Sequence, residues 1–216
     1  MKIGVMAGTP IDTQMGVEYI QSKGHDAIGF ACSKDAAEQN EMQILHKEEL
    51  LEIAINGCLD MVKQGAEGIY VYCNSLSGAI DMDKLKITVP VFVITPLDIY
   101  KMCADKYNRL AVIAANGQSL AGIERTILAA NPECTVFGAG LLPMVVEIES
   151  ATPSADIYNN FQLKKMTDSF VAIGCDALIL GCTHFPYVEK EITDGISVEV
   201  INPSDRMLDV LIQNRK

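Results

Sequence analysis

Three features that mark other protein classes are missing from this 216-residue sequence: an excess of basic residues, a long apolar run and a paired-cysteine pattern. Lysine and arginine total 17 against 28 aspartates and glutamates, which gives a formal net charge of −11. A surface this acidic disfavours nucleic acid and anionic lipid as partners. No apolar stretch approaches the roughly 18 residues of a membrane span. We therefore expect a cytoplasmic protein that acts on a small molecule.

The seven cysteines are odd in number and form no C-x-x-C motif. This spacing argues against a disulfide framework and against a zinc ribbon, so we expect reduced thiols. Cys58, Cys103 and Cys134 lie within apolar patterns. Because free cysteine commonly behaves as a small buried hydrophobe, we assign these three no chemistry.

Neither a metal site nor a nucleotide-binding loop can be recognised. Cys182 and His184 form one Cys-x-His pair, far short of the four ligands of a tetrahedral site. The run Gly138-Ala139-Gly140 lacks the remaining glycine and the helix start of a dinucleotide fingerprint. We expect no metal and no cofactor.

Short apolar runs alternate with longer helical patterns along the whole chain. The expected strands are KIGVMA, AIGFAC, IYVYC, VPVFVI, RLAVIAA, ECTVFGAG, ALILGC and VEVIN. The helical patterns between them fall near 14–22, 47–63, 76–85, 97–106, 118–130 and 154–173, with one more at the end of the chain. Near-continuous apolar strands that alternate with helices predict parallel sheets covered on both faces.

The two halves of the chain also resemble each other. Three pairs of segments correspond: residues 2–7 with 109–114, Gly65 and Cys73 with Gly174 and Cys182, and VFVITPLD (91–98) with VEVINPSD (198–205). Their offsets are 107, 109 and 107 residues (109 − 2, 182 − 73 and 198 − 91), so the pairs are collinear. This pattern predicts an α/β fold of two similar doubly wound domains, related by a pseudo-twofold axis with the active site in the cleft between them.

Cys73 and Cys182 both follow a predicted strand, where parallel α/β sheets bind their ligands. Two opposed thiols could remove a proton from one face of a carbon acid and deliver one to the other face. A thiol pKa near roughly 8.5 can be tuned to supply both the acid and the base. Asn74, Ser75 and Thr183 would lie where each strand turns into a helix, and there they could bind a substrate carboxylate.

The runs Gly-Cys-Thr-His-Phe-Pro (181–186) and Tyr-Cys-Asn-Ser (72–75) resemble the aspartate/glutamate racemase superfamily. The GCTHFP motif is most like the glutamate racemase branch. The resemblance implies a cofactor-independent racemase that interconverts L and D enantiomers of aspartate, glutamate or a close relative. It also implies two interleaved domains, residues 1–95 with 200–216 and residues 96–199, and suggests a homodimer.

The resemblance assigns roles to individual positions. Cys73 and Cys182 become the two bases, and His184 supports Cys182. On the Cys73 side, Asp12 or Thr9 takes the place of the acid that glutamate racemases carry in an Asp-Ser-Gly context. The remaining assignments are Asn116 and Ser119 as substrate-binding substitutes for threonines and Glu147, one residue out of step, as support for Cys182.

Other readings stay open at this point. Asp12 could simply cap the helix that follows it, and Glu147 could be a solvated helical residue. A second class of function keeps the fold and uses a cysteine for isomerisation, decarboxylation or hydantoin racemisation. A third is not an enzyme: a dicarboxylate-binding protein or a thiol redox sensor.

Overall fold

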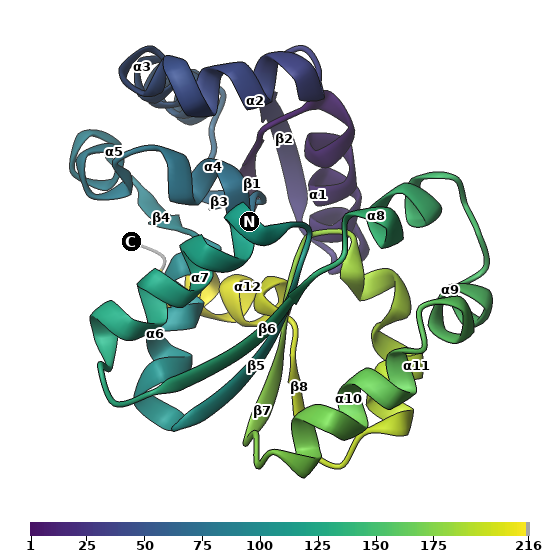
Figure 1. Ribbon diagram of the computed structural model, residues 1–216. Coiled ribbons are helices and arrows are strands. Elements are labelled where there is room, and N and C mark those ends of the chain that lie inside the picture. Colours follow the sequence, from purple (N-terminus) through teal and green to yellow (C-terminus); the bar gives the residue numbers. More distant parts are fainter. Residues whose placement is uncertain (215–216) are drawn as a thin grey trace. The chain divides into compact units, whose positions relative to one another are not determined.

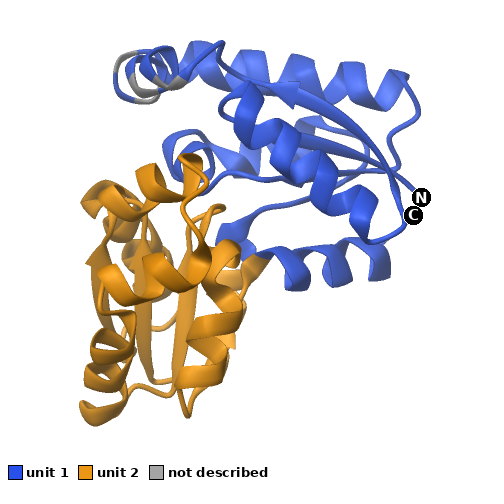
Figure 2. Cartoon of the chain, turned by 90° about the vertical axis from the view of Figure 1, so that its right-hand side faces the viewer, with its two compact units in different colours: residues 1–98, 204–216 blue, residues 99–203 orange. Residues whose placement is uncertain are grey.

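The computed structural model describes residues 1–214, with all their side chains except those of residues 36, 40, 43 and 45. The chain forms two compact units, Met1–Asp98 with Ser204–Lys216 and Ile99–Pro203 (Figure 2). The sequence placed the boundaries at 95/96 and 199/200. In the structure, the chain leaves unit 1 after Asp98, in the first turn of the helix Pro96–Lys106. It returns at Ser204, in the first turn of the helix Pro203–Gln213.

Unit 1 is built on one four-stranded parallel sheet of order β2-β1-β3-β4 (Figure 1). Its strands are β1 (Lys2–Ala7), β2 (Asp26–Ala31), β3 (Gly68–Val71) and β4 (Phe92–Ile94). Its helices are α1 (Pro10–Ser22), α2 (Ala36–Leu45), α3 (Lys47–Lys63), α4 (Asn74–Ala79), α5 (Met82–Thr88) and the C-terminal α12 (Pro203–Gln213).

Unit 2 repeats the arrangement with a parallel sheet of order β6-β5-β7-β8. Its strands are β5 (Arg109–Ala114), β6 (Thr135–Gly140), β7 (Ala177–Gly181) and β8 (Glu199–Ile201). Its helices are α6 (Pro96–Lys106), α7 (Gly117–Ala130), α8 (Leu142–Glu149), α9 (Ser154–Asn160), α10 (Leu163–Ala172), the 3₁₀ helix η1 (Phe185–Val188) and α11 (Glu189–Gly195).

The identical strand order of the two sheets confirms the predicted fold class of two similar α/β domains. Two predicted helices are each divided in the structure. Asp81 caps the start of α5 and separates it from α4. Gln162, with a left-handed φ of 51°, separates α9 from α10. Because periodicity continues across such a short break, the sequence pattern alone did not reveal it.

The sheet of unit 1 has helices on both faces because its side chains alternate. Met6 on β1 faces α3, where its Sδ lies 3.7 Å from the Cys58 sulfur. Tyr70 and Tyr72 project to the opposite face, and their rings stack with that of Tyr19 on α1, with centroids 6.0–6.3 Å apart. This alternation is the period of two that strands impose on their side chains.

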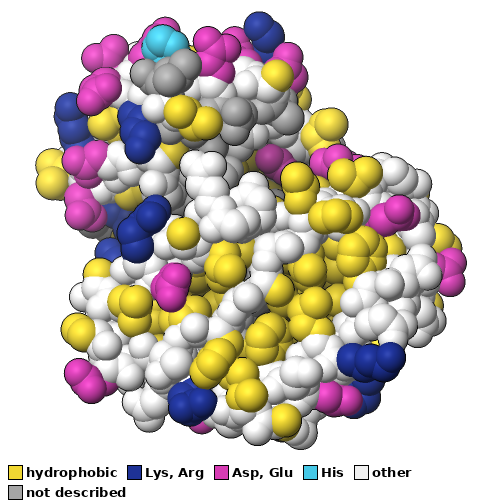
Figure 3. Space-filling view, viewed as in Figure 1, with side chains coloured by type: hydrophobic (Ala, Val, Ile, Leu, Met, Phe, Trp, Pro, Cys, Tyr) yellow, Lys and Arg dark blue, Asp and Glu magenta, His cyan; other side chains and the backbone are white. Residues whose placement is uncertain are grey.

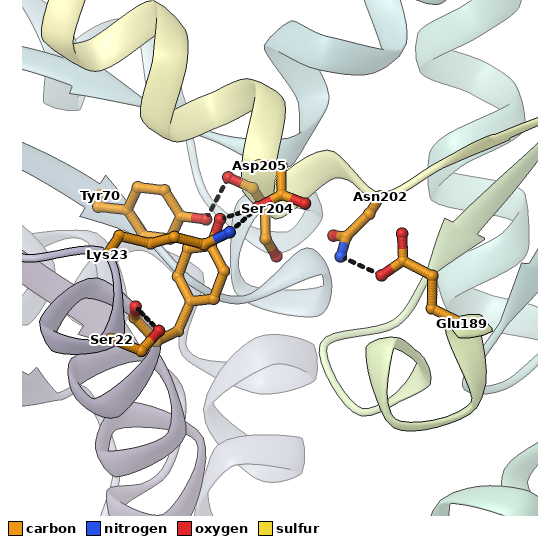
Figure 4. Close-up of polar contacts among 8 residues, drawn as sticks. Ser22, Lys23, Tyr70, Glu189, Asn202, Ser204 and Asp205 are labelled. Carbon is orange, nitrogen blue, oxygen red and sulfur yellow. Dashed lines mark hydrogen bonds and ion pairs between the residues drawn. The ribbon is translucent and has the colours of Figure 1, made fainter.

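The same face of the sheet holds the C-terminal helix α12. The Tyr70 hydroxyl donates to the Ser204 carbonyl oxygen at 2.9 Å, and Lys23 pairs with Asp205 at 2.8 Å (Figure 4). The Tyr19 hydroxyl also donates to Asp205, at 2.6 Å. Burial tends to raise the Asp205 pKa, but Lys23 and Tyr19 outweigh it and leave that pKa below its ordinary value. These contacts fix the last helix to a unit that is otherwise built from the first 98 residues.

Replacing Tyr70 by phenylalanine is expected to lower the free energy of unfolding by about 1–2 kcal/mol, because a buried carbonyl loses a donor while the ring stays in place. The matched control is Tyr187→Phe, since the Tyr187 side chain is exposed in unit 2. Urea denaturation followed by circular dichroism measures both variants. Equal effects at the two positions would show that the Tyr70 hydroxyl adds nothing to the docking of α12.

The core of unit 2 lies between its sheet and helices α8–α11, and includes the fully buried Phe185. On the face shown in Figure 3, hydrophobic side chains gather over the lower part of the view, and lysines and arginines are interspersed with acids. No helix within residues 1–214 is both long enough and apolar enough to cross a membrane.

Candidate active site

Cys73 follows β3 at the carboxyl end of the unit 1 sheet. Tyr72 continues the strand pairing through its N–H to the Met6 carbonyl at 2.8 Å, and Cys73 is then the N-cap of α4. Only 5% of Cys73 is exposed. The strand ending predicted from the sequence therefore delivers a nearly buried sulfur to the sheet edge where α/β folds bind ligands.

Besides the Gly8 backbone N–H, three polar groups surround the Cys73 sulfur. The Leu76 backbone N–H donates to it at 3.5 Å, and the Ser75 hydroxyl lies 3.4 Å away. The third group is the side-chain amide of Gln39 on α2, whose Nε2 lies 3.6 Å from the sulfur and 3.1 Å from Ser75 Oγ. The sulfur is thus held in a polar shell inside an apolar setting.

Opposing effects act on the pKa of Cys73. Burial raises this pKa and the nearby Asp12 carboxylate raises it further, whereas Ser75 and the backbone N–H groups of Leu76 and Gly8 lower it. The net pKa lies above the ordinary thiol value. Burial and the Asp12 charge therefore favour the thiol of Cys73, and the donors to its sulfur favour the thiolate.

Thr9 and Asp12, the two alternatives proposed for the Cys73 side, both lie at the start of α1. Thr9 is the N-cap of this helix, and its Oγ1 accepts from the Asp12 N–H at 3.2 Å. Asp12 occupies the first turn and is close enough to Cys73 to raise its pKa. Thr9 therefore fills the capping role considered for Asp12, and the Asp12 carboxylate is the charged group near the sulfur.

Cys182 follows β7 in unit 2 at the position equivalent to Cys73, and 7% of it is exposed. Its sulfur lies 3.7 Å from Nδ1 of His184, which is also buried. On the other side of the ring, His184 Nε2 lies 3.2 Å from Oε1 of Glu149 at the end of α8. A thiol, an imidazole and a carboxylate therefore form a connected series.

The acid in this series is Glu149 rather than Glu147. Glu147 accepts a hydrogen bond from Thr152 Oγ1 at 2.7 Å. The two glutamates are two residues apart on α8, and positions two apart project in different directions from a helix. The sequence prediction named Glu147 in this segment, whereas the direction of α8 relative to β7, a tertiary property, brings Glu149 to His184.

The remaining predicted residues occupy helix starts. Asn74 and Ser75 open α4, and Thr183 lies between Cys182 and η1. Asn116 is the N-cap of α7, and its Oδ1 accepts from the Ser119 N–H at 2.8 Å. All of these positions follow a strand within their own unit, at the edge where the cysteines lie.

Sequence reasoning missed Gln39 and Glu149. Neither lies in a motif, and only their spatial neighbours distinguish them from other helical polar residues. Within residues 1–214, no group of three or more histidine, cysteine, aspartate or glutamate side chains is arranged to hold a metal ion. All seven cysteines lie within the described residues, where they are buried and form no disulfide. Each unit thus presents one sulfur with polar support at the same strand end.

Comparisons with known proteins agree with this geometry. The family model described as Asp/Glu/Hydantoin racemase matches residues 13–208. A glutamate racemase from Desulforudis audaxviator is 30% identical over 160 residues, covering 71% of this chain and 57% of the relative. One from Limosilactobacillus reuteri is 26% identical over 167 residues, covering 73% of this chain and 60% of the relative. The chain spans about 60% of the length of these curated relatives.

Solved structures show the same fold. The structure of a Francisella tularensis glutamate racemase in complex with D-glutamate aligns with a TM-score of 0.71 at 22% identity, covering 99% of this chain and 81% of that one. An aspartate racemase homologue from Pyrococcus horikoshii aligns with a TM-score of 0.70 at 18% identity, covering 98% and 97%. Together with the match over residues 13–208, the shared architecture shows that this chain belongs to the Asp/Glu/Hydantoin racemase family.

Proposed function

We propose that this protein is a cofactor-independent racemase that interconverts the L and D enantiomers of aspartate, glutamate or a close relative. One observation carries the proposal: Cys73 and Cys182 occupy equivalent strand ends in two units of identical strand order. Family membership supports the reaction class, and the curated relatives are glutamate racemases.

The proposed reaction is a two-base proton transfer. One cysteine, as thiolate, takes the α-proton, and the other, as thiol, gives its proton to the opposite face of the α-carbon. The C–H bond that breaks and the one that forms lie on opposite faces, so the stereocentre inverts. After one turnover the first cysteine is a thiol and the second is a thiolate. The enzyme is then ready to act on the other enantiomer. This scheme requires the two units to present their sulfurs to one substrate.

The neighbours of each sulfur support distinct roles. His184, held by Glu149, would exchange a proton with Cys182 or stabilise its thiolate. Ser75 and the Leu76 N–H would stabilise the Cys73 thiolate, against the Asp12 carboxylate. We assign substrate binding to a further set of polar residues: Thr9, Asn74, Asn116, Ser119 and Thr183.

The reaction is tested by proton NMR in D₂O with both enantiomers of aspartate, glutamate and other amino acids. Racemisation replaces the α-proton by deuterium, so the α-proton signal of the true substrate disappears whichever enantiomer is supplied. Absence of exchange with every amino acid would reject the proposal. Because the family description also covers hydantoin racemases, hydantoins form the second substrate set, and turnover of these alone would assign that reaction instead.

The proposal includes a cytoplasmic location and a homodimer. Seven buried cysteines without a disulfide among the described residues are typical of a reducing compartment. The dimer is suggested by family resemblance, and light scattering of the purified protein across a dilution series tests it. A single mass equal to the 23.5-kDa chain would reject that part of the proposal.

A further inference from the structure

Gln39 contacts the Cys73 sulfur from a distant part of unit 1. It lies 34 residues before Cys73, on α2, a helix that the sequence analysis did not predict. Its Nε2 reaches both the Cys73 sulfur at 3.6 Å and Ser75 Oγ at 3.1 Å. A single amide group therefore joins the two polar atoms at the start of α4.

Gly8, directly after β1, leaves the space that this amide occupies. A Cβ at residue 8 would lie 2.2 Å from Nε2 and 2.4 Å from Cδ of Gln39. The Gly8 backbone N–H also acts on Cys73, and lowers its pKa. The amide thus packs against the backbone of Gly8 on one side and against sulfur on the other.

We propose that Gln39 is a positioning residue that holds the Cys73 sulfur in place and stabilises its thiolate form through a hydrogen bond from Nε2. This inference deepens the proposed function. It rests on that function only for the role of the Cys73 thiolate as a base. An N–H donor favours the charged form of the sulfur that accepts from it. A donor matters here because the sulfur is nearly buried.

Among the described residues, two ionisable side chains from other elements interact electrostatically with Cys73. Asp12 on α1 raises the Cys73 pKa, and Cys32, just after β2, interacts with it. Burial keeps the Cys32 pKa well above its ordinary value, so Cys32 stays neutral. Helix α4 itself carries no ionisable side chain. Ser75 and the backbone N–H groups of Leu76 and Gly8 are the neutral donors that oppose burial and the Asp12 charge. Gln39 Nε2, at 3.6 Å from the sulfur, is placed to add one more donor.

The test is the pH dependence of alkylation at Cys73, which requires no turnover. Iodoacetamide labelling from pH 6 to 10, quantified on the Cys73 peptide by mass spectrometry, gives a midpoint set by the sulfur pKa and a plateau set by its exposure. Gln39→Met, which keeps the length of the side chain and removes the donor, is expected to raise the midpoint by about 0.5–1 pH unit. Labelling near pH 7.5 then slows by about three- to tenfold.

Gly8→Ala provides a second variant that retains Gln39. The new Cβ displaces the flexible amide end of Gln39, so the Cys73 midpoint is expected to rise in the same direction. Because both changes remove one hydrogen bond, the double variant should shift the midpoint no further than the larger single shift. The Cys182 peptide in each sample is the internal control, and its midpoint should not move.

A Cys73 midpoint that is unchanged or lowered in Gln39→Met would overturn the inference, and so would equal shifts at Cys73 and Cys182. Additive shifts in the double variant would likewise reject a shared hydrogen bond. The racemase proposal fails by a different observation, the absence of solvent exchange in the wild-type protein. The two ideas can therefore be rejected separately.

Discussion

Replacing either Cys73 or Cys182 by alanine is expected to lower kcat/KM for racemisation by about 10³-fold or more, because each variant lacks one of two proton-transfer groups. Both enantiomers must be affected equally in kcat/KM. Enantiomers have the same free energy, so the equilibrium constant is one and the two directions stay linked. Circular dichroism of the amino acid, followed from each enantiomer, measures the rates.

The two single variants should also differ in a diagnostic way. Any α-proton exchange with D₂O that survives in one variant is expected to occur with a single enantiomer, and with the opposite one in the other variant. Cys134→Ala is the control, since Cys134 is also a buried free cysteine but precedes its strand β6 rather than following one. Full racemisation by either Cys73→Ala or Cys182→Ala would exclude the two-base mechanism.

The second large effect is expected at the series formed by Cys182, His184 and Glu149. His184→Asn should lower kcat/KM by about 100-fold, because it removes an imidazole 3.7 Å from the sulfur. Glu149→Gln should cost less, about tenfold, since this carboxylate acts only by orienting the ring and its side chain is 51% exposed. The assay is the same rate measurement from both enantiomers.

Glu147→Gln is the matched control for Glu149→Gln. Both residues are glutamates of α8, but Glu147 bonds to Thr152 and Glu149 contacts His184. We expect Glu147→Gln to racemise at the wild-type rate. A large loss at Glu147 with none at Glu149 would contradict the assignment and restore the choice made from the sequence.

The duplicated Thr-Pro-x-Asp and Asn-Pro-x-Asp segments show which structural features a local motif predicts and which it does not. Proline at the first position of a helix with an acid two residues later predicts a helix start, and α6 and α12 begin at Pro96 and Pro203. The acids nevertheless acquired different partners. Asp98 accepts from the Thr95 N–H and hydroxyl and pairs with Lys86, whereas Asp205 pairs with Lys23.

The neighbouring polar positions diverged as well. The Thr95 hydroxyl donates to Asp98, the acid in the first turn of the helix that follows it. The equivalent Asn202 instead donates to Glu189 at 2.7 Å, as Figure 4 shows. A motif specifies local backbone geometry because that depends on a few adjacent residues. It does not specify the partner of a side chain, which depends on segments that lie far away in the chain.

The sequence by itself determined the alternating α/β pattern, the duplication and the position of both cysteines at strand ends, because strand periodicity, helix-start residues and motif spacing are all local properties. It also located the family through the residues around Cys73 and Cys182. Only the tertiary structure decided that Glu149 contacts His184 and that Gln39 contacts Cys73. Those contacts follow from how α8 and α2 pack within their units, and packing is set by long-range burial that no local pattern encodes.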